Sequence, residues 1–209
     1  MNLVFDIGSN IGRTAEIFKT HSDKVICFEP TPNLVESLVS RFKYDENVII
    51  DSRAISHQNG AQIFNIANAN TISTFSEEWI NNSRFTGDYE WNEKLLVKTI
   101  TLSQAILEYG VPDYIKIDTE GYEYEILTNF HELLPTTLFA FEWAEEQKDK
   151  IEKILFHLFQ IGYTQFAYTE GDPVLFENQI SWTNYEDFGF IPMLQKERKS
   201  LWGMMYFKM

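Results

Sequence analysis

The chain has 209 residues, 44% of them hydrophobic, and no internal repeat, which predicts a single globular domain over residues 1–209. Its formal net charge of -14 argues against nucleic acid as a partner, because binding to phosphates relies on Lys and Arg. The apolar runs are shorter than the ~20 residues of a membrane span, the N-terminus lacks the pattern of a signal peptide, and the only cysteine, Cys27, excludes an intrachain disulfide, so we expect a cytoplasmic protein without a membrane span.

Short apolar runs alternate with helix-period segments, which is typical of βαβ units around a parallel sheet. Strands are expected at Leu3–Ile7, Lys24–Glu29, Asn47–Asp51, Leu96–Leu102, Asp113–Asp118, Thr137–Glu142, Tyr163–Tyr168 and Met204–Lys208. Helices are expected between them, including one from Tyr122 to Leu134 that Pro135 stops. This alternation predicts a doubly wound α/β fold.

Two aromatic segments, residues 68–93 and 171–189, interrupt this pattern. Long loops in a compact domain are usually functional or disordered, and the aromatic residues argue against disorder. We therefore expect a lid over a binding site at 68–93 and an aromatic insertion at 171–189. In the lid, the flat faces of Trp79, Tyr89 and Trp91 would either stack on a ligand or pack into the core.

A glycine turn follows the first strand in the stretch VFDIGSNIGRTAEIF, with Gly8 and Gly12 at a G-x-x-x-G spacing. Glycine has no side chain to obstruct a ligand that approaches the backbone. The spacing differs from the G-x-G-x-x-G of dinucleotide folds. The turn therefore predicts a ligand site, and NAD is not the favoured ligand.

Five of the apolar runs end in an acid: Asp6, Glu29, Asp51, Asp118 and Glu142. In a doubly wound sheet these strand ends share one edge, where ligands bind. A cleft lined by negative charge suits S-adenosylmethionine, whose sulfonium is positive and whose ribose diol can bond a carboxylate. Glu29 has the position expected of the ribose-binding acid, whereas Asp51 either faces the adenine or caps the next turn.

The motifs VFDIGSNIG, FEP, IKIDTEGYEYEIL and FAFE together resemble the FkbM-type family of S-adenosylmethionine-dependent O-methyltransferases, over roughly Leu3 to Glu142. The resemblance implies a Rossmann-like class I methyltransferase fold: a seven-stranded, mostly parallel sheet with helices on both faces and a last antiparallel strand. It also implies methylation of hydroxyls on sugars or secondary metabolites. The cofactor-binding residues implied are Asp6, Gly8, Ser9, Asn10, Gly12 and Glu29, with Ala54 near the adenine and Asp118 beside the transferred methyl.

The catalytic candidates are Asp118, Glu120 and Glu142. We expect the chemistry to centre on Asp118, with Glu142 as the alternative base. A sugar hydroxyl is a weak nucleophile, so a carboxylate that accepts its proton could accelerate the reaction ~10²- to 10⁴-fold. Asp118 and Glu142 end adjacent expected strands, while Glu120 is either part of the site or a structural residue at a helix start. Glu123 and Glu125 lie further along the expected helix, and we expect this pair to include a solvated face.

Asp118, Glu120 and Glu142 could also hold Mg²⁺ or Mn²⁺, but no residue spacing here demands a metal, so no metal ligand is assigned. The four histidines form no ligand pattern. Lys116 either points into the crevice or pairs with the acids around it.

The predicted partner is a small-molecule or glycan acceptor. Two rival functions stay open: a non-catalytic cofactor-binding module of a larger multidomain glycan-synthesis protein, and an NAD-dependent oxidoreductase.

Overall fold

The computed structural model describes residues 1–188 and 201–209, in which a main sheet has eight strands in the order β10-β9-β11-β8-β7-β1-β2-β3. These are β1 (Leu3–Ile7), β2 (Lys24–Phe28), β3 (Val48–Asp51), β7 (Tyr114–Ile117), β8 (Leu138–Ala144), β9 (Gln165–Glu170), β10 (Thr183–Asn184) and β11 (Trp202–Lys208). Strand β11 runs antiparallel between β8 and β9. The expected α/β fold is confirmed, with eight strands in place of seven because the two-residue β10 extends the edge beside β9.

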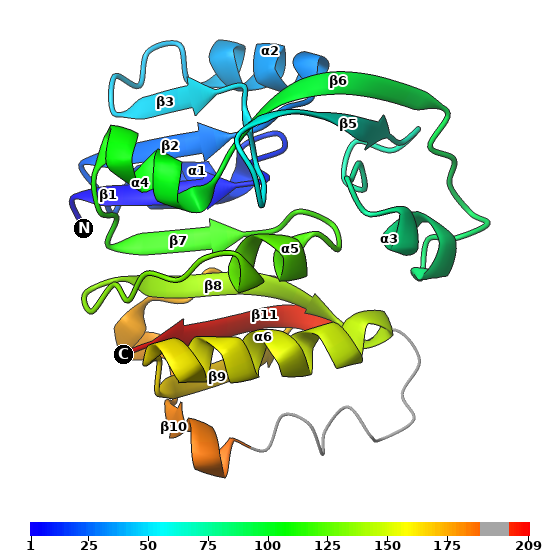
Figure 1. Cartoon of the computed structure of the whole chain (residues 1–209). Coiled ribbons are helices and arrows are strands. Elements are labelled where there is room, and N and C mark those ends of the chain that lie inside the picture. Colours follow the sequence, from blue (N-terminus) through cyan, green and yellow to red (C-terminus); the bar gives the residue numbers. More distant parts are fainter. Residues whose placement is uncertain (189–200) are drawn as a thin grey trace.

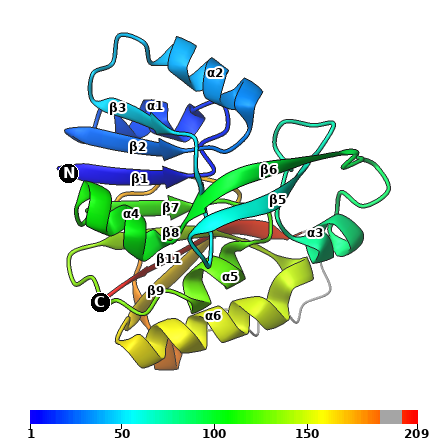
Figure 2. The ribbon, with the colours of Figure 1, turned by 45° about the horizontal axis from the view of Figure 1, so that its top comes forward.

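Helices cover both faces of this sheet (Figures 1 and 2). They are α1 (Arg13–Phe18) and α2 (Pro32–Arg41) on one face, and α4 (Leu102–Tyr109), α5 (Glu123–Thr128) and α6 (Lys148–Ile161) on the other. Successive strand residues point to opposite faces, so Val4 packs toward α1 while Phe5 joins the cluster that includes α6. No helix in these described ranges combines the length and apolar composition that a membrane crossing requires.

A second, three-stranded sheet lies beyond the carboxyl ends of the parallel strands (Figure 1). It contains β4 (Ala54–Ile55), β5 (Gly60–Ile66) and β6 (Glu93–Ile100), and α3 (Glu77–Asn82) lies in the long connection between β5 and β6. The sequence pattern predicts neither β5 nor α3. Three short 3-10 helices, η1 (Glu145–Gln147), η2 (Glu177–Gln179) and η3 (Tyr185–Asp187), complete the described elements.

Aromatic side chains of residues 68–93 and 171–189 pack against the rest of the protein more than the sequence suggests. Trp79 is only 2% exposed, so it belongs to the core and does not offer a face to a ligand. The indole of Trp91 donates to the carbonyl of Ile72 at 2.8 Å, and Tyr89 is 41% exposed. In the second segment Trp182 packs against the cluster on the α1 and α2 face, and Gly189 lies outside the described residues.

The glycine turn brings the end of β1 into close contact with the end of β7. Gly8 has a φ of +77°, and its amide donates to the carbonyl of Phe28 at 3.0 Å. A Cβ at this position would lie 1.8 Å from the carbonyl oxygen of Asp118. Only glycine therefore permits the two strand ends to approach this closely.

We expect Gly8→Ala to lower the free energy of unfolding far more than Gly87→Ala. Gly87 has a φ of +91° and nothing within 4 Å of an added Cβ, so that variant should lose only the ~1–2 kcal/mol of the left-handed backbone. Gly8→Ala should lose a further ~1–3 kcal/mol because a backbone carbonyl must move. Urea unfolding of both variants measures the difference, and equal losses would contradict the close contact.

Candidate functional site

A cavity of about 640 Å³ lies at the carboxyl ends of the parallel strands. Its walls come from the glycine turn, the end of β2, the second sheet, residues 68–93, the turn after β7 and the start of β11. The sequence-predicted residues that line it are Gly8, Ser9, Asn10, Glu29, Ala54, Asp118, Glu120 and Glu142. A cavity of this size suits a small-molecule ligand.

Three other predicted cofactor residues do not line this cavity, and they support its walls. Asp6 is fully buried beneath the turn. A Cβ on Gly12 would lie 2.6 Å from the ring of Phe42, so Gly12 makes room for helix packing. Asp51 accepts hydrogen bonds from the Arg53 guanidinium at 2.6 Å and from the Arg53 amide at 2.9 Å, which fits the turn-capping interpretation.

Glu29 is held in place by two backbone amides. Its Oε2 accepts from the Asn10 amide at 3.0 Å and its Oε1 from the Thr31 amide at 2.9 Å. Burial raises the pKa of this carboxyl, although the Thr31 hydroxyl and both amides act to lower it. Two carboxylate oxygens offer about four lone-pair sites, so Glu29 keeps acceptor capacity for a ligand hydroxyl.

The side chain of Asn10 ties the turn to the expected lid. Its Nδ2 donates to the carbonyl of Asn70 at 3.1 Å, and both residues line the cavity. Asn10 has a φ of 50°, in the left-handed region that asparagine tolerates better than most residues. The turn and residues 68–93 therefore meet along one wall.

Lys116 pairs with acids at the centre of the sheet. It lies opposite Asp6 in the parallel register of β1 and β7, and its Nζ is 2.9 Å from Oδ2 of Asp118 and 3.9 Å from Oδ1 of Asp6. Burial opposes the charge on the lysine, but the Asp118 and Asp6 carboxylates together raise the pKa of Lys116 above its usual value. Burial also raises the pKa of Asp6.

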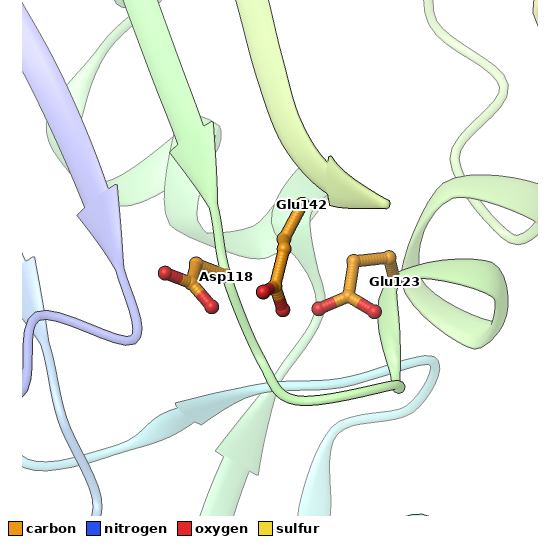
Figure 3. Close-up of side chains that lie close together, drawn as sticks. All are labelled: Asp118, Glu123 and Glu142. Carbon is orange, nitrogen blue, oxygen red and sulfur yellow. The ribbon is translucent and has the colours of Figure 1, made fainter. Parts of the chain in front are cut away.

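Asp118, Glu123 and Glu142 lie close together (Figure 3). One carboxylate oxygen from each residue lies within 4.8 Å of the other two. Burial raises the pKa of Glu123 to about 7. Burial and the neighbouring Asp118 and Glu120 carboxylates raise the pKa of Glu142 well above its usual range. The carboxyl groups of Glu123 and Glu142 therefore protonate more readily than exposed acids.

Of the two acids expected to include a solvated face, Glu123 is buried at 2% exposure, whereas the side chain of Glu125 is 30% exposed. The Oε1 of Glu123 accepts from the amide and the hydroxyl of Thr119 at 2.6 and 2.9 Å. Ile126, Leu127 and Phe130, three, four and seven positions further on, are also buried. That spacing marks the core face of a helix, so the sequence did contain a signal for the burial of Glu123.

The carboxylates of Figure 3 already have protein partners. Lys116 donates to Asp118, Thr119 donates to Glu123, and the Arg84 guanidinium donates to Glu142 at 3.3 Å. A divalent cation would have to compete with two cationic side chains. This arrangement does not favour Mg²⁺ or Mn²⁺, and the clustered acids are Asp118, Glu123 and Glu142, with Glu123 where the sequence considered Glu120.

Glu120 lines the cavity in a strained backbone conformation. Its φ is 54°, which is uncommon for a residue other than glycine, and Gly121 follows with a φ of 88°. Burial, with Asp118 and Glu123 nearby, raises the pKa of Glu120 well above its usual range. Strain of this kind persists where the surrounding structure holds a residue in place, and it clusters at functional sites.

Two cavity residues, Arg84 and Trp202, have no role in the sequence prediction. Arg84 is the only Lys or Arg between residues 68 and 93, a segment with five acids, and this isolated cation was the available signal. Trp202 begins β11, and its part in the site depends on the pairing of β11 with β8, which is remote in sequence.

The chain resembles known proteins both in sequence pattern and in fold. Residues 6–200 match the family described as the methyltransferase FkbM domain. The methyltransferase FkbM from Methylobacillus flagellatus KT is 13% identical, with 99% of this chain and 43% of that chain covered and a TM-score of 0.56. Precorrin-6y C5,15-methyltransferase from Geobacter metallireducens GS-15 is 10% identical, with 100% and 80% covered and a TM-score of 0.52. A search of the curated proteins finds no match.

These solved structures share the class I methyltransferase fold with this chain, and at such low identity the likeness shows the fold alone. The chain spans less than half the length of the Methylobacillus flagellatus protein, of which it covers 43%.

The buried Glu123 predicts a pH-dependent stability. Its pKa is raised from 4.5 to about 7, so the folded protein holds this proton more tightly than the unfolded chain, and its ionisation destabilises the fold as the pH rises through 7. We therefore expect Glu123→Gln to exceed the wild type in free energy of unfolding at pH 8, by up to ~3 kcal/mol, with the gain vanishing near pH 4.

Urea unfolding across pH 4–8 measures this gain, with Glu152→Gln at an exposed position of α6 as the control. Parallel pH profiles for the wild type and Glu123→Gln would exclude Glu123 as the titrating group.

Proposed function

Because the chain belongs to the FkbM methyltransferase family, we propose that it transfers the methyl group of S-adenosylmethionine to a hydroxyl oxygen of a sugar or a sugar-bearing metabolite. One observation carries this proposal: a single cavity joins the glycine turn and Glu29 to the carboxylates of Asp118, Glu120 and Glu142. The first group suits the cofactor and the second suits an acceptor hydroxyl.

The residues at the turn fit the cofactor. The close approach at Gly8 leaves backbone without side chains facing the cavity, and Glu29 keeps lone pairs for a ribose diol. Ala54 lines the region assigned to the adenine. When bound, S-adenosylmethionine supplies a methyl group made electrophilic by the positive sulfonium. In this proposal residues 1–209 form one catalytic domain and residues 68–93 are its acceptor lid.

Glu142 is the group that we assign to the acceptor proton. Asp118 already accepts a hydrogen bond from Lys116 at 2.9 Å, which fixes its carboxylate and leaves its remaining lone pairs to position the acceptor hydroxyl. The raised pKa of Glu142 makes its carboxylate a stronger proton acceptor near neutral pH. Asp118 then orients the hydroxyl while Glu142 removes its proton.

We expect S-adenosylmethionine and S-adenosylhomocysteine to bind the wild type and to raise its melting temperature. Glu29→Ala should weaken binding by ~1.5–3 kcal/mol, roughly ten- to hundredfold in Kd, because a charge-assisted hydrogen bond is lost. Glu36→Ala, at an exposed position on α2, is the matched control. Calorimetry decides the matter, and binding of NAD in place of both compounds would contradict the proposal.

Glu142→Gln should lower turnover by ~10²-fold or more and abolish the rise of turnover with pH, because the proton acceptor is lost. In the wild type this rise should lie above the usual carboxyl range, since burial raises the pKa of Glu142 and the ionised form is required. Asp118→Asn should lower turnover and retain the rise. Turnover is measured against pH at saturating cofactor, and melting curves check that each variant folds. If Glu142→Gln retained the pH dependence, another group would be the proton acceptor.

A further inference from the structure

Arg84 is fixed at the acceptor end of the cavity by contacts from several elements. Its backbone amide donates to Glu146 at 2.8 Å, and its Nη2 donates to Glu142 at 3.3 Å. Its side chain is only 15% exposed. These bonds attach the expected lid to the end of β8, so Arg84 and the adjoining Phe85 have a defined position beside Glu142.

The guanidinium of Arg84 also orders the aromatic rings around it. It lies over the rings of Phe85 and Trp202, at 4.7 and 5.4 Å from their centroids. The buried Trp79 contacts the same guanidinium at 5.3 Å. Contacts of this kind are attractive and directional, so the rings and the cation stabilise one another's orientation.

The strand register explains why Trp202 and Glu142 meet. Trp202 pairs with Ala144 and Met204 pairs with Glu142 in the antiparallel β11–β8 ladder. Residues opposite each other, and residues two apart on one strand, point to the same face. Trp202 is therefore the diagonal neighbour of Glu142 on that face, within reach of a long or aromatic side chain.

The charges at this end select against charged acceptors. Lys116 and Arg84 are already paired with Asp118 and Glu142, so an anionic acceptor would meet the remaining carboxyl groups of Glu120 and Asp172. A cationic acceptor on these rings would lie beside the guanidinium of Arg84, a like charge held 4.7 and 5.4 Å from their centroids. An uncharged ring with an apolar face and flanking hydroxyls fits both constraints.

We propose that Arg84, Phe85 and Trp202 form the acceptor subsite, in which Phe85 and Trp202 contact the apolar face of an uncharged cyclic polyol and Arg84 holds both rings in register with Glu142. This inference rests on the proposed methyl transfer and names its acceptor class. It assigns the ring contacts to Phe85 and Trp202, which line the cavity, in place of Trp79, Tyr89 and Trp91.

The test uses methyl pyranosides that differ in charge: an uncharged hexoside, the corresponding uronoside and the corresponding amino sugar. Calorimetry with the S-adenosylhomocysteine complex should show that the wild type prefers the uncharged hexoside by about tenfold or more. Trp202→Ala and Phe85→Ala should each weaken hexoside binding about tenfold, while the Kd for S-adenosylhomocysteine stays unchanged. Tyr44→Ala, at an 85% exposed aromatic residue, should change neither.

Two further variants separate subsite from scaffold. Trp202→Phe keeps an aromatic face and should recover most of the hexoside binding. Arg84→Lys keeps the charge but not the planar fork, so it should weaken hexoside binding while the melting temperature stays close to that of the wild type. Tighter binding of the uronoside or the amino sugar, or hexoside binding that survives Trp202→Ala and Phe85→Ala, would overturn the subsite.

Methyl transfer is measured separately with the same pyranosides. A wild type that binds the hexoside through these residues but methylates no hydroxyl would contradict the proposed function and leave the subsite supported. Transfer to the hexoside with an unchanged KM in Trp202→Ala and Phe85→Ala would overturn the subsite and leave the function supported.

Discussion

A buried lysine holds together the acids of two neighbouring strands at the centre of the molecule. Lys116 is 8% exposed and lies between Asp118 and Asp6, which would otherwise place like charges beside each other in the sheet. Removing one partner of a buried ion pair typically lowers the free energy of unfolding by ~3–5 kcal/mol, because the other charge is left uncompensated. Both the glycine turn after β1 and the acidic turn after β7 depend on this pairing for their position.

The signals that could be read from the sequence are local. Apolar runs of strand length and the glycines of the first turn can be recognised within a short window of sequence. The strands β1, β2, β7 and β8 and the fold class therefore follow from the local pattern. The carboxyl ends of parallel strands must share an edge, and this rule alone brings Glu29, Asp118 and Glu142 to one cavity. The same rule places Asp51 at that edge, where Arg53 engages its carboxylate.

The remaining features depend on contacts between distant parts of the chain. Gly60–Ile66 contains glycine, glutamine and asparagine and forms a strand because β6 pairs with it. Arg84 is positioned by hydrogen bonds to Glu142 and Glu146, about sixty residues away. Trp202 is positioned by the register of β11 against β8. Such pairings have no local pattern, which is why the sequence alone does not single out Arg84 or Trp202. The cofactor and catalytic roles stay predictions that the cavity geometry supports.

The position of β11 also constrains the order in which the sheet can assemble. Strand β9 follows β8 in the chain but does not pair with it, because β11 lies between them. Thr169 on β9 and Met204 on β11 are 35 residues apart, so this closure carries a loop entropy that must be paid before β9 is joined to the parallel strands. Long-range pairing of this kind slows folding. Strands β9 and β10 therefore join the parallel strands only through β11, the strand that carries Trp202.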